Sequence, residues 1–439
     1  MTSKETIDAL KLAGRQPISI DDFEQISARA AAVVNRVRKA MLQPYGKKAA
    51  PTFQTAALAA LVGLDMKQVD YRVKKGGLPP GTIPPTSKRR VFTVGDVRKW
   101  CQALRAAKLK PEGGEAITLV VANFKGGVTK TTTAVAMAQG LALRGHRCLL
   151  IDADAQASAT SLFGLVPEVG ASGSDATAEK DSQSGSRGEG AGEASPVNGE
   201  STASVPGPEV GVDEDQTLLP LCKGDQESVE YAIRETYWEG LDLIPASASL
   251  FAAEFELPAR QMTSRGERFE FWNVLNNGIE QARLDYDVII IDTPPALSYL
   301  TVNALMAADG MIMPLPPSAL DFLSSTQFWG LVSSLTEGLK KHGATKEFDF
   351  IDVVLAKVDP DDAAAPEVRR WIAGAYGDKV VSVSIPKTST AGSASAEFGT
   401  VYDQHRKAAT QAYDNLVDLV EEQIGAAWLR QLTRFAEVK

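Results

Sequence analysis

The chain has 439 residues, 44% of them hydrophobic, and a formal net charge of −9 at pH 7. This length exceeds one ordinary hydrophobic core, so we expect two or three domains. The sequence has no run of about 18 apolar residues and no basic head before an apolar core, which argues against a membrane span and a secretory signal. The three cysteines are scattered and there are only three histidines, which fits a reducing cytoplasm and argues against a Cys- or His-rich metal centre.

Residues 1–50 are predicted to be a helical accessory segment. A periodic stretch follows Asp21 and Asp22 and runs to about Met41. A pairing helix that supports dimerisation and a simple solvated helix both fit this pattern.

Residues 51–110 are predicted to form a small helical domain with a wing. Two short helical stretches, Thr55–Leu61 and Met66–Lys75, are separated by a glycine-containing turn. A strand-like wing follows at Lys88–Phe92, and Thr93 is a suitable cap for a third helix.

The same segment carries a one-sided charge, with twelve Lys and Arg residues against three Asp. Such a basic module in an acidic protein predicts contact with nucleic acid. The helix pair and wing resemble a winged helix-turn-helix, whose second helix enters the major groove of DNA. The candidate DNA-binding residues are Lys67, Arg72, Lys74 and Lys75 on the second helix and Lys88, Arg89 and Arg90 on the wing.

Residues 116–410 have a different character. Apolar runs of strand length, such as Ile117–Ala122 and Val288–Ile291, alternate with helical segments. Continuous apolar runs are typical of strands that are buried on both faces of a parallel sheet. The pattern therefore predicts an α/β domain with a doubly wound, mostly parallel sheet, preceded by the helical module.

Two further segments flank or interrupt this domain. Residues 167–216 are rich in Gly, Ser, Ala and Glu, carry eleven acidic residues against two basic ones, and are predicted to be a disordered insert. Residues 411–439 show apolar residues at helical spacing. We expect a C-terminal helix packed on the domain or on a dimer partner. The acids along it disfavour the alternative of a helix that binds a membrane surface.

The sharpest motif follows the first strand of the α/β domain and opens a helix that runs to about Leu143. Glycines in such a turn let backbone N–H groups approach an anion, and the helix N-terminus favours negative charge. Lys130 is expected to contact the β and γ phosphates of a nucleotide, and the Thr131 hydroxyl to bind Mg²⁺. The residues expected to hold the phosphates are Lys125, Gly126, Gly127, Val128, Thr129, Lys130, Thr131 and Thr132.

The motif departs from the ordinary G-x-x-x-x-G-K-[ST] pattern, because Phe124 and Thr129 stand where the two glycines belong. With the additional lysine Lys125 at its start, the motif instead resembles the deviant phosphate loop of the ParA/MinD family of P-loop ATPases. That resemblance implies a catalytic role for Lys125, which would reach across a nucleotide-sandwich dimer to the partner's phosphates. If residue 129 has a positive φ, a threonine there is strained and turnover is expected to be slow.

Two more motifs at strand ends resemble the same family. Asp154, after the strand ending at Asp152, matches the carboxylate that activates the attacking water, and Asp152 supports the site. Asp292, which follows another apolar strand, matches the residue that acts on Mg²⁺. Adenine contacts in this family come from late strand ends, which places Pro386 and Lys357 near the expected nucleotide.

The resemblance implies a cytoplasmic, nucleoid-associated partition ATPase that uses ATP/ADP and Mg²⁺. Such a protein forms a homodimer, binds nonspecific DNA, is stimulated by a ParB-type centromere-binding partner, and segregates a plasmid or secondary chromosome. The larger branch of the family also binds an operator and represses its own operon. Two alternatives remain open: a nucleotide-responsive repressor without significant turnover, and a MinD-like membrane-positioning ATPase. We expect no stable membrane association.

Overall fold

The computed structural model describes residues 48–85, 87–167, 211–263, 269–387, 399–403 and 407–438, together with a few positions between 19 and 33. The chain divides into one unit of residues 1–37 and 168–211 and a second unit of residues 38–167 and 212–439. The predicted accessory segment 1–50 and the predicted disordered insert 167–216 lie largely outside the described residues. The last residues of that insert are ordered, however, because Asp213 and Gln216 form a capping box around a short 3₁₀ turn.

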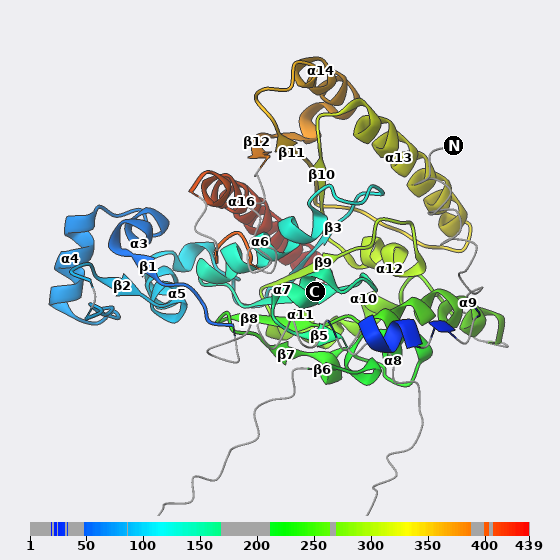
Figure 1. The fold of residues 1–439 in the computed structure, drawn as a ribbon, viewed down its shortest axis with the longest axis horizontal. Coiled ribbons are helices and arrows are strands. Elements are labelled where there is room, and N and C mark those ends of the chain that lie inside the picture. Colours follow the sequence, from blue (N-terminus) through cyan, green and yellow to red (C-terminus); the bar gives the residue numbers. More distant parts are fainter. Residues whose placement is uncertain are drawn as a thin grey trace, which may run out of the picture. The chain divides into compact units, whose positions relative to one another are not determined.

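An eight-stranded sheet forms the centre of the second unit, in the order β12-β11-β10-β3-β9-β4-β8-β7. All neighbouring strands are parallel except the edge pair β7–β8, which is antiparallel. This agrees with the doubly wound, mostly parallel sheet that the apolar runs predict (Figure 1). The strands are β3 (Ile117–Val121), β4 (Cys148–Asp152), β7 (Arg234–Glu235), β8 (Leu241–Ile244), β9 (Val288–Asp292), β10 (Gly310–Leu315), β11 (Phe350–Val358) and β12 (Val380–Pro386).

Helices cover both faces of this sheet, because alternate residues of each buried strand point to opposite sides. In β9, Val288 and Ile290 join one hydrophobic core, whereas Ile289 and Ile291 join the other. The first core contains α6 (Lys130–Leu143) and α16 (Lys407–Val438). The helices of the second core are α8 (Leu219–Lys223), α9 (Ala253–Thr263), α10 (Val274–Gly278), α11 (Glu280–Asp285), α12 (Tyr299–Ala307), α13 (Ala319–Lys340) and α14 (Ala365–Tyr376).

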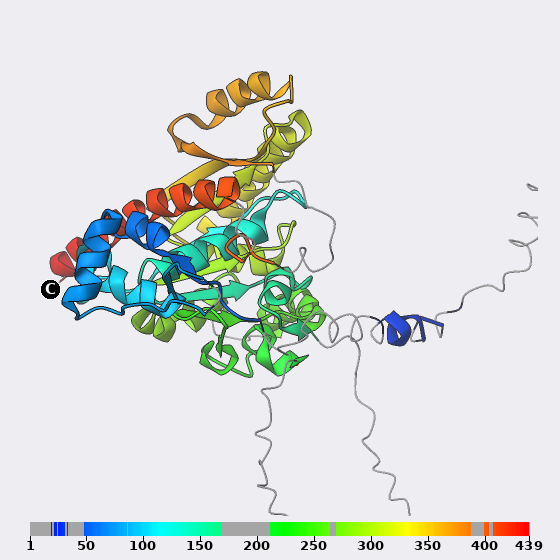
Figure 2. The same ribbon diagram turned by 60° about the vertical axis from the view of Figure 1, so that its left-hand side comes forward.

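Residues 51–110 fold as three helices and a two-stranded sheet. Helices α3 (Thr55–Leu61) and α4 (Met66–Lys75) span the two predicted helical stretches, and α5 (Val94–Leu104) follows the strand pair of β1 (Phe53–Gln54) with β2 (Val91–Phe92). Capping boxes begin α4 and α5, each with a side chain that accepts from the N3 backbone N–H. Figure 1 labels α3, α4 and α5 of this segment, and Figure 2 shows the same segment from another side. Its identity as a winged helix-turn-helix stays a prediction.

The remaining short elements connect these layers. They are α7 (Ser158–Leu162), β5 (Val166–Pro167), β6 (Gly211–Val212) and the 3₁₀ turns Ala106–Lys108, Glu214–Gln216, Glu230–Ala232, Ala248–Ala252 and Gly377–Lys379.

Helix α16 packs along α6 and β12, and its apolar stripe of Leu416, Val417, Val420 and Ile424 is fully buried. The C-terminal helix is thus part of the domain core, as the apolar spacing favours. Among the described residues, no helix combines the length and the apolar character needed to cross a membrane.

Candidate nucleotide-phosphate site

The loop from Asn123 to Thr129 connects the central strand β3 to helix α6. Its glycines Gly126 and Gly127 are exposed, and Gly127 has φ 72°, a left-handed conformation that a glycine adopts without strain. Helix α6 begins with no side-chain cap. The backbone N–H groups of its first turn, which includes Thr131 and Thr132, therefore have no capping oxygen and suit an anion.

Thr129 is the strained residue of this loop. Its φ is 76° and its ψ is 19°, in the left-handed region that β-branched residues rarely adopt. Residue 129 therefore has the positive φ under which a threonine is strained. The Thr129 hydroxyl lies 3.5 Å from the hydroxyl of Thr133, which in turn lies 3.4 Å from that of Tyr413 on α16. These contacts link the loop to the C-terminal helix.

Both lysines of the motif contact other parts of the chain. The Nζ of Lys130 donates to the backbone oxygen of Lys125 at 3.1 Å, while the Nζ of Lys125 lies 2.8 Å from Oδ1 of Asp321. Burial lowers the pKa of Lys130, against the opposing charges of Asp292 and Asp154. Lys130 is thus a buried cation near carboxylates, whereas Lys125 is a half-buried cation in the phosphate loop. Nothing in the local sequence around Lys125 points to Asp321, which sequence reasoning missed.

Two carboxylates meet at the carboxyl edge of the sheet. Because β4 and β9 are parallel neighbours in register, Asp152 lies directly opposite Asp292, and Asp292 also lies opposite the last residue of β3. Asp152 accepts hydrogen bonds from Thr160, from its backbone N at 2.8 Å and its hydroxyl at 2.7 Å. Burial nevertheless raises the pKa of Asp152 to about 6. These bonds hold the turn after β4 in place, which suits a supporting role.

Asp292 differs from Asp152, because no hydrogen bond of normal geometry reaches either of its buried oxygens from the described residues. Burial, and then the charge of Asp152, raises the pKa of Asp292 well above its ordinary value, while the Thr131 hydroxyl nearby partly offsets this. A buried carboxylate without a strong donor is costly unless a cation accompanies it. The residues here therefore fit Mg²⁺, which prefers oxygen ligands and shares them with nucleotide phosphates.

Asp154 lies in the turn after β4 and is largely buried, with 9% of its surface exposed. Its Oδ1 accepts a hydrogen bond from the backbone N of Gln156 at 2.9 Å, and its backbone N contacts Asp152. The turn thus places the carboxylate of Asp154 close enough for its charge to contribute to the pKa shifts of Lys130, Asp152 and Asp292.

The candidate adenine contacts lie at the ends of β11 and β12. The register between these strands is irregular, and Lys357 there has φ 51°, a second strained position. Pro386 ends β12 and is half-buried. The distance from either residue to a base stays a prediction.

The candidate DNA-binding residues are mostly exposed. Lys67, Arg72, Lys74, Lys75, Lys88 and Arg89 are exposed, whereas Arg90 is half-buried and donates to the backbone oxygen of Pro80. Helix α4 also exposes two large apolar residues, Met66 at 56% and Tyr71 at 66% of their surface. Charge counting missed these two, although their position on the same helix was the available signal.

Helix α5 joins residues 51–110 to the α/β domain. The buried guanidinium of Arg98 donates to the backbone oxygens of Ala142 and, at 2.7 Å, of His146, just after α6 ends. Arg105 pairs with Glu421 of α16, which also lies 3.0 Å from His146 Nε2. Carbonyls at the C-terminal end of a helix favour a cation. They stabilise Arg98 there together with the nearby charges of Glu239 and Asp287.

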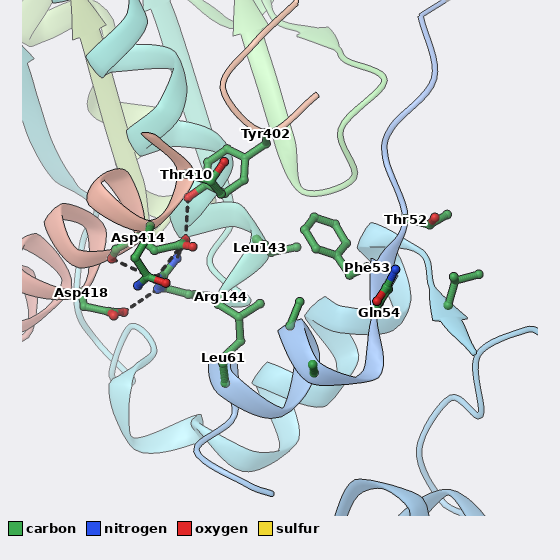
Figure 3. A pocket seen from close by; sticks show the side chains of 15 residues that line it. Thr52, Phe53, Gln54, Leu61, Leu143, Arg144, Tyr402, Thr410, Asp414 and Asp418 are labelled. Atoms are coloured by element: carbon green, nitrogen blue, oxygen red, sulfur yellow. Dashed lines mark hydrogen bonds and ion pairs between the residues drawn. The ribbon is translucent and has the colours of Figure 1, made fainter. Parts of the chain in front are cut away.

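A cavity of about 770 Å³ lies between α3 and the end of α6, with α16 as its third wall (Figure 3). Its floor is an ion cluster in which Arg144 contacts Asp418 at 2.8 Å and Asp414 at 3.5 Å. Since α6 is 14 residues long, the cavity lies roughly 20 Å along the helix from the phosphate loop and is separate from it.

Fold and site together define a P-loop protein of the doubly wound α/β class, and comparison with known proteins agrees. A family described as an AAA domain matches residues 116–342. A putative replication protein A from Rhizobium rhizogenes is 28% identical over 88% of this chain and 90% of its own length. The chromosome partitioning protein ParA of Caulobacter vibrioides is 30% identical over 61% of this chain and 80% of its own length. The protein SopA of Escherichia coli is 26% identical over 86% of this chain and 88% of its own length.

Among solved structures, a partition protein aligns with a TM-score of 0.59 over 92% of this chain and 97% of its own length, at 18% identity. That likeness supports the fold. The chain therefore belongs to the ParA-type partition ATPases within the AAA-domain family.

Proposed function

We propose that this chain is an ATP-hydrolysing partition protein. It forms an ATP-sandwich homodimer, binds DNA without sequence preference, and is stimulated by a ParB-type partner to segregate a plasmid or secondary chromosome. In this proposal it is a cytoplasmic, nucleoid-associated protein that also represses its own operon through residues 51–110. The observation that carries the proposal is the uncapped start of α6 with buried Lys130, whose ammonium group is near enough to the carboxylate of Asp292 for their charges to interact.

In the proposed site the first turn of α6 and Lys130 bind the phosphates. Thr131 and Asp292 hold Mg²⁺, which neutralises negative charge on the phosphate oxygens when it is bound. Asp154 orients the attacking water and accepts its proton, because its carboxylate lies in the turn beside the same strand ends. Asp152 keeps that turn in position through Thr160.

The two lysines are proposed to act in different subunits. Lys130→Ala is expected to abolish binding of ATP, because it removes the buried cation of the loop. Lys125→Ala is expected to leave binding largely intact and to prevent dimer-dependent hydrolysis. Calorimetric titration of both variants with ATP and Mg²⁺ tests this, and an equal loss of affinity in both refutes the separate role of Lys125.

Hydrolysis separates this proposal from a repressor whose nucleotide site has no turnover. Asp154→Ala is expected to remove basal and partner-stimulated phosphate release while the variant still binds ATP. Unchanged release in that variant refutes the assignment of Asp154, and no release from the wild type favours the repressor.

DNA binding separates it from a membrane-positioning ATPase. With ATP and Mg²⁺, the full chain is expected to be retained by nonspecific DNA and not to sediment with anionic liposomes. The packing of the α16 apolar stripe into the core supports this expectation.

Operator binding is tested with a separate variant. A chain with Lys67, Lys74 and Lys75 changed to Ala is expected to lose operator binding while keeping ATP binding.

A further inference from the structure

Lys125 is held at both ends by its own chain. Its backbone oxygen accepts a hydrogen bond from Lys130 Nζ at 3.1 Å, and its own Nζ lies 2.8 Å from Asp321 Oδ1. The Asp321 side chain is 11% exposed and that of Lys125 is 38% exposed. The ion pair is therefore partly shielded from water, and it joins the phosphate loop to the first turn of α13.

The two oxygens of Asp321 have different partners. Oδ1 contacts Lys125, whereas Oδ2 accepts a hydrogen bond from the Ser318 hydroxyl. The Ser318 side chain also caps α13 by accepting from the backbone N of Asp321. Capping of α13 is thus carried out by Ser318, and the oxygen that contacts Lys125 takes no part in it. An explanation of Asp321 as a helix-capping residue alone leaves this second contact unused.

We propose that Asp321 is a positioning residue that holds Lys125 within its own subunit and must release it before Lys125 can serve the nucleotide of a second copy. This inference rests on the proposed function, in which Lys125 acts across the dimer. The Asp321 carboxylate and a partner's phosphates compete for one ammonium group. The ion pair therefore opposes dimerisation until nucleotide is present in the facing subunit, whose greater negative charge attracts the lysine.

The first test measures the ion pair without nucleotide. The full chain is treated with a limiting amount of an amine-acylating reagent, and modification of Lys125 relative to exposed Lys74 is followed by mass spectrometry. Asp321→Asn keeps an acceptor for Ser318 and removes the charge, so we expect Lys125 to react several-fold faster. Ser318→Ala, which loses the cap and keeps the ion pair, is expected to leave the rate of Lys125 unchanged. Equal rates in the wild type and Asp321→Asn overturn the proposal.

The second test measures dimerisation by sedimentation velocity with Mg²⁺ and a non-hydrolysable ATP analogue. Asp321→Asn is expected to dimerise at about fivefold lower protein concentration, the combined effect of removing two partly exposed ion pairs from the dimer, one in each subunit. Asp321→Glu, which keeps the charge, is expected to remain closer to the wild type. The stronger dimerisation caused by Asp321→Asn must disappear when Lys125 is also changed to Ala, because Asp321 acts only through that lysine.

The outcomes separate the two ideas. Unchanged or weaker dimerisation of Asp321→Asn, or a gain that persists without Lys125, overturns the role of Asp321. If the wild-type chain neither binds the analogue nor dimerises, the proposed function fails, whereas the labelling rates still decide whether Asp321 holds Lys125.

Discussion

Thr129→Gly is expected to stabilise the nucleotide-free protein, which is unusual for a change in a phosphate loop. The residue has φ 76°, and a left-handed conformation costs a non-glycine residue about 1–2 kcal/mol. Glycine loses more backbone entropy on folding than threonine does, and this offsets about 0.4–1 kcal/mol of the stabilisation expected from relieving the strain. The lost hydroxyl contact to Thr133 is long, at 3.5 Å, so its removal costs little. The net gain is therefore about 0.5–1 kcal/mol, the difference between these two magnitudes.

Urea unfolding followed by circular dichroism, without nucleotide, provides the measurement. Thr129→Ala is the matched control, because it removes the same hydroxyl and keeps the positive φ. It is expected to be no more stable than the wild type, and Thr129→Asn to lie between the two, since Asn tolerates this conformation better. If Thr129→Gly unfolds at a lower urea concentration than the wild type, backbone strain at this position is not a cost to the fold.

Three further changes follow from buried groups. Burial raises the pKa of Asp292 in the folded state, so its charged form destabilises the fold at neutral pH. Asp292→Asn is expected to stabilise the nucleotide-free protein in urea at pH 7. This gain shrinks as the pH falls toward the unfolded-state pKa of Asp, about 3.9, and disappears below about pH 3, where the carboxyl is protonated in both states. Gly240→Ala is expected to cost about 2–4 kcal/mol in the same assay, because Gly240 has φ 82° and its added Cβ would lie 1.9 Å from Arg98 Cζ. Arg98→Met is expected to cost about 2–3 kcal/mol, because the backbone oxygens of Ala142 and His146 lose a buried donor. Wild-type stability of Arg98→Met would show that this contact contributes nothing.

The sheet and its strand-end motifs were accessible from the sequence for a physical reason. Strands buried on both faces appear as continuous apolar runs, and parallel strands bring their carboxyl ends to one edge. Motifs distant in the sequence, at Lys130, Asp152 and Asp292, therefore meet without knowledge of the exact register. The predicted end of α6, at about Leu143, also agrees with the structure, in which α6 ends at Leu143 and Arg144 follows as its C-cap.

Other features depend on contacts that no local pattern encodes. The pairing of Lys125 with Asp321 joins the loop to a helix far along the chain. Arg98 is one of the twelve basic residues counted in residues 51–110, but it is buried against the end of α6 and is therefore not part of a charged surface. Both depend on how helices pack against the sheet, which residue spacing alone does not determine.

The hydrophobic core has one consequence for exchanging parts between related proteins. Leu58, Phe92 and Trp100 of residues 51–110 belong to the same buried cluster as Leu141 of α6 and Trp428 of α16. A hybrid that receives only α3 and α4 from a relative would keep this shared packing if its inward residues match. A chain cut near residue 110 would instead leave indole and aliphatic surface unpaired on both fragments. If residues 51–110 bind an operator, as proposed, a new DNA preference is therefore easier to introduce by substitution on the outer side of α4 than by transfer of the whole segment.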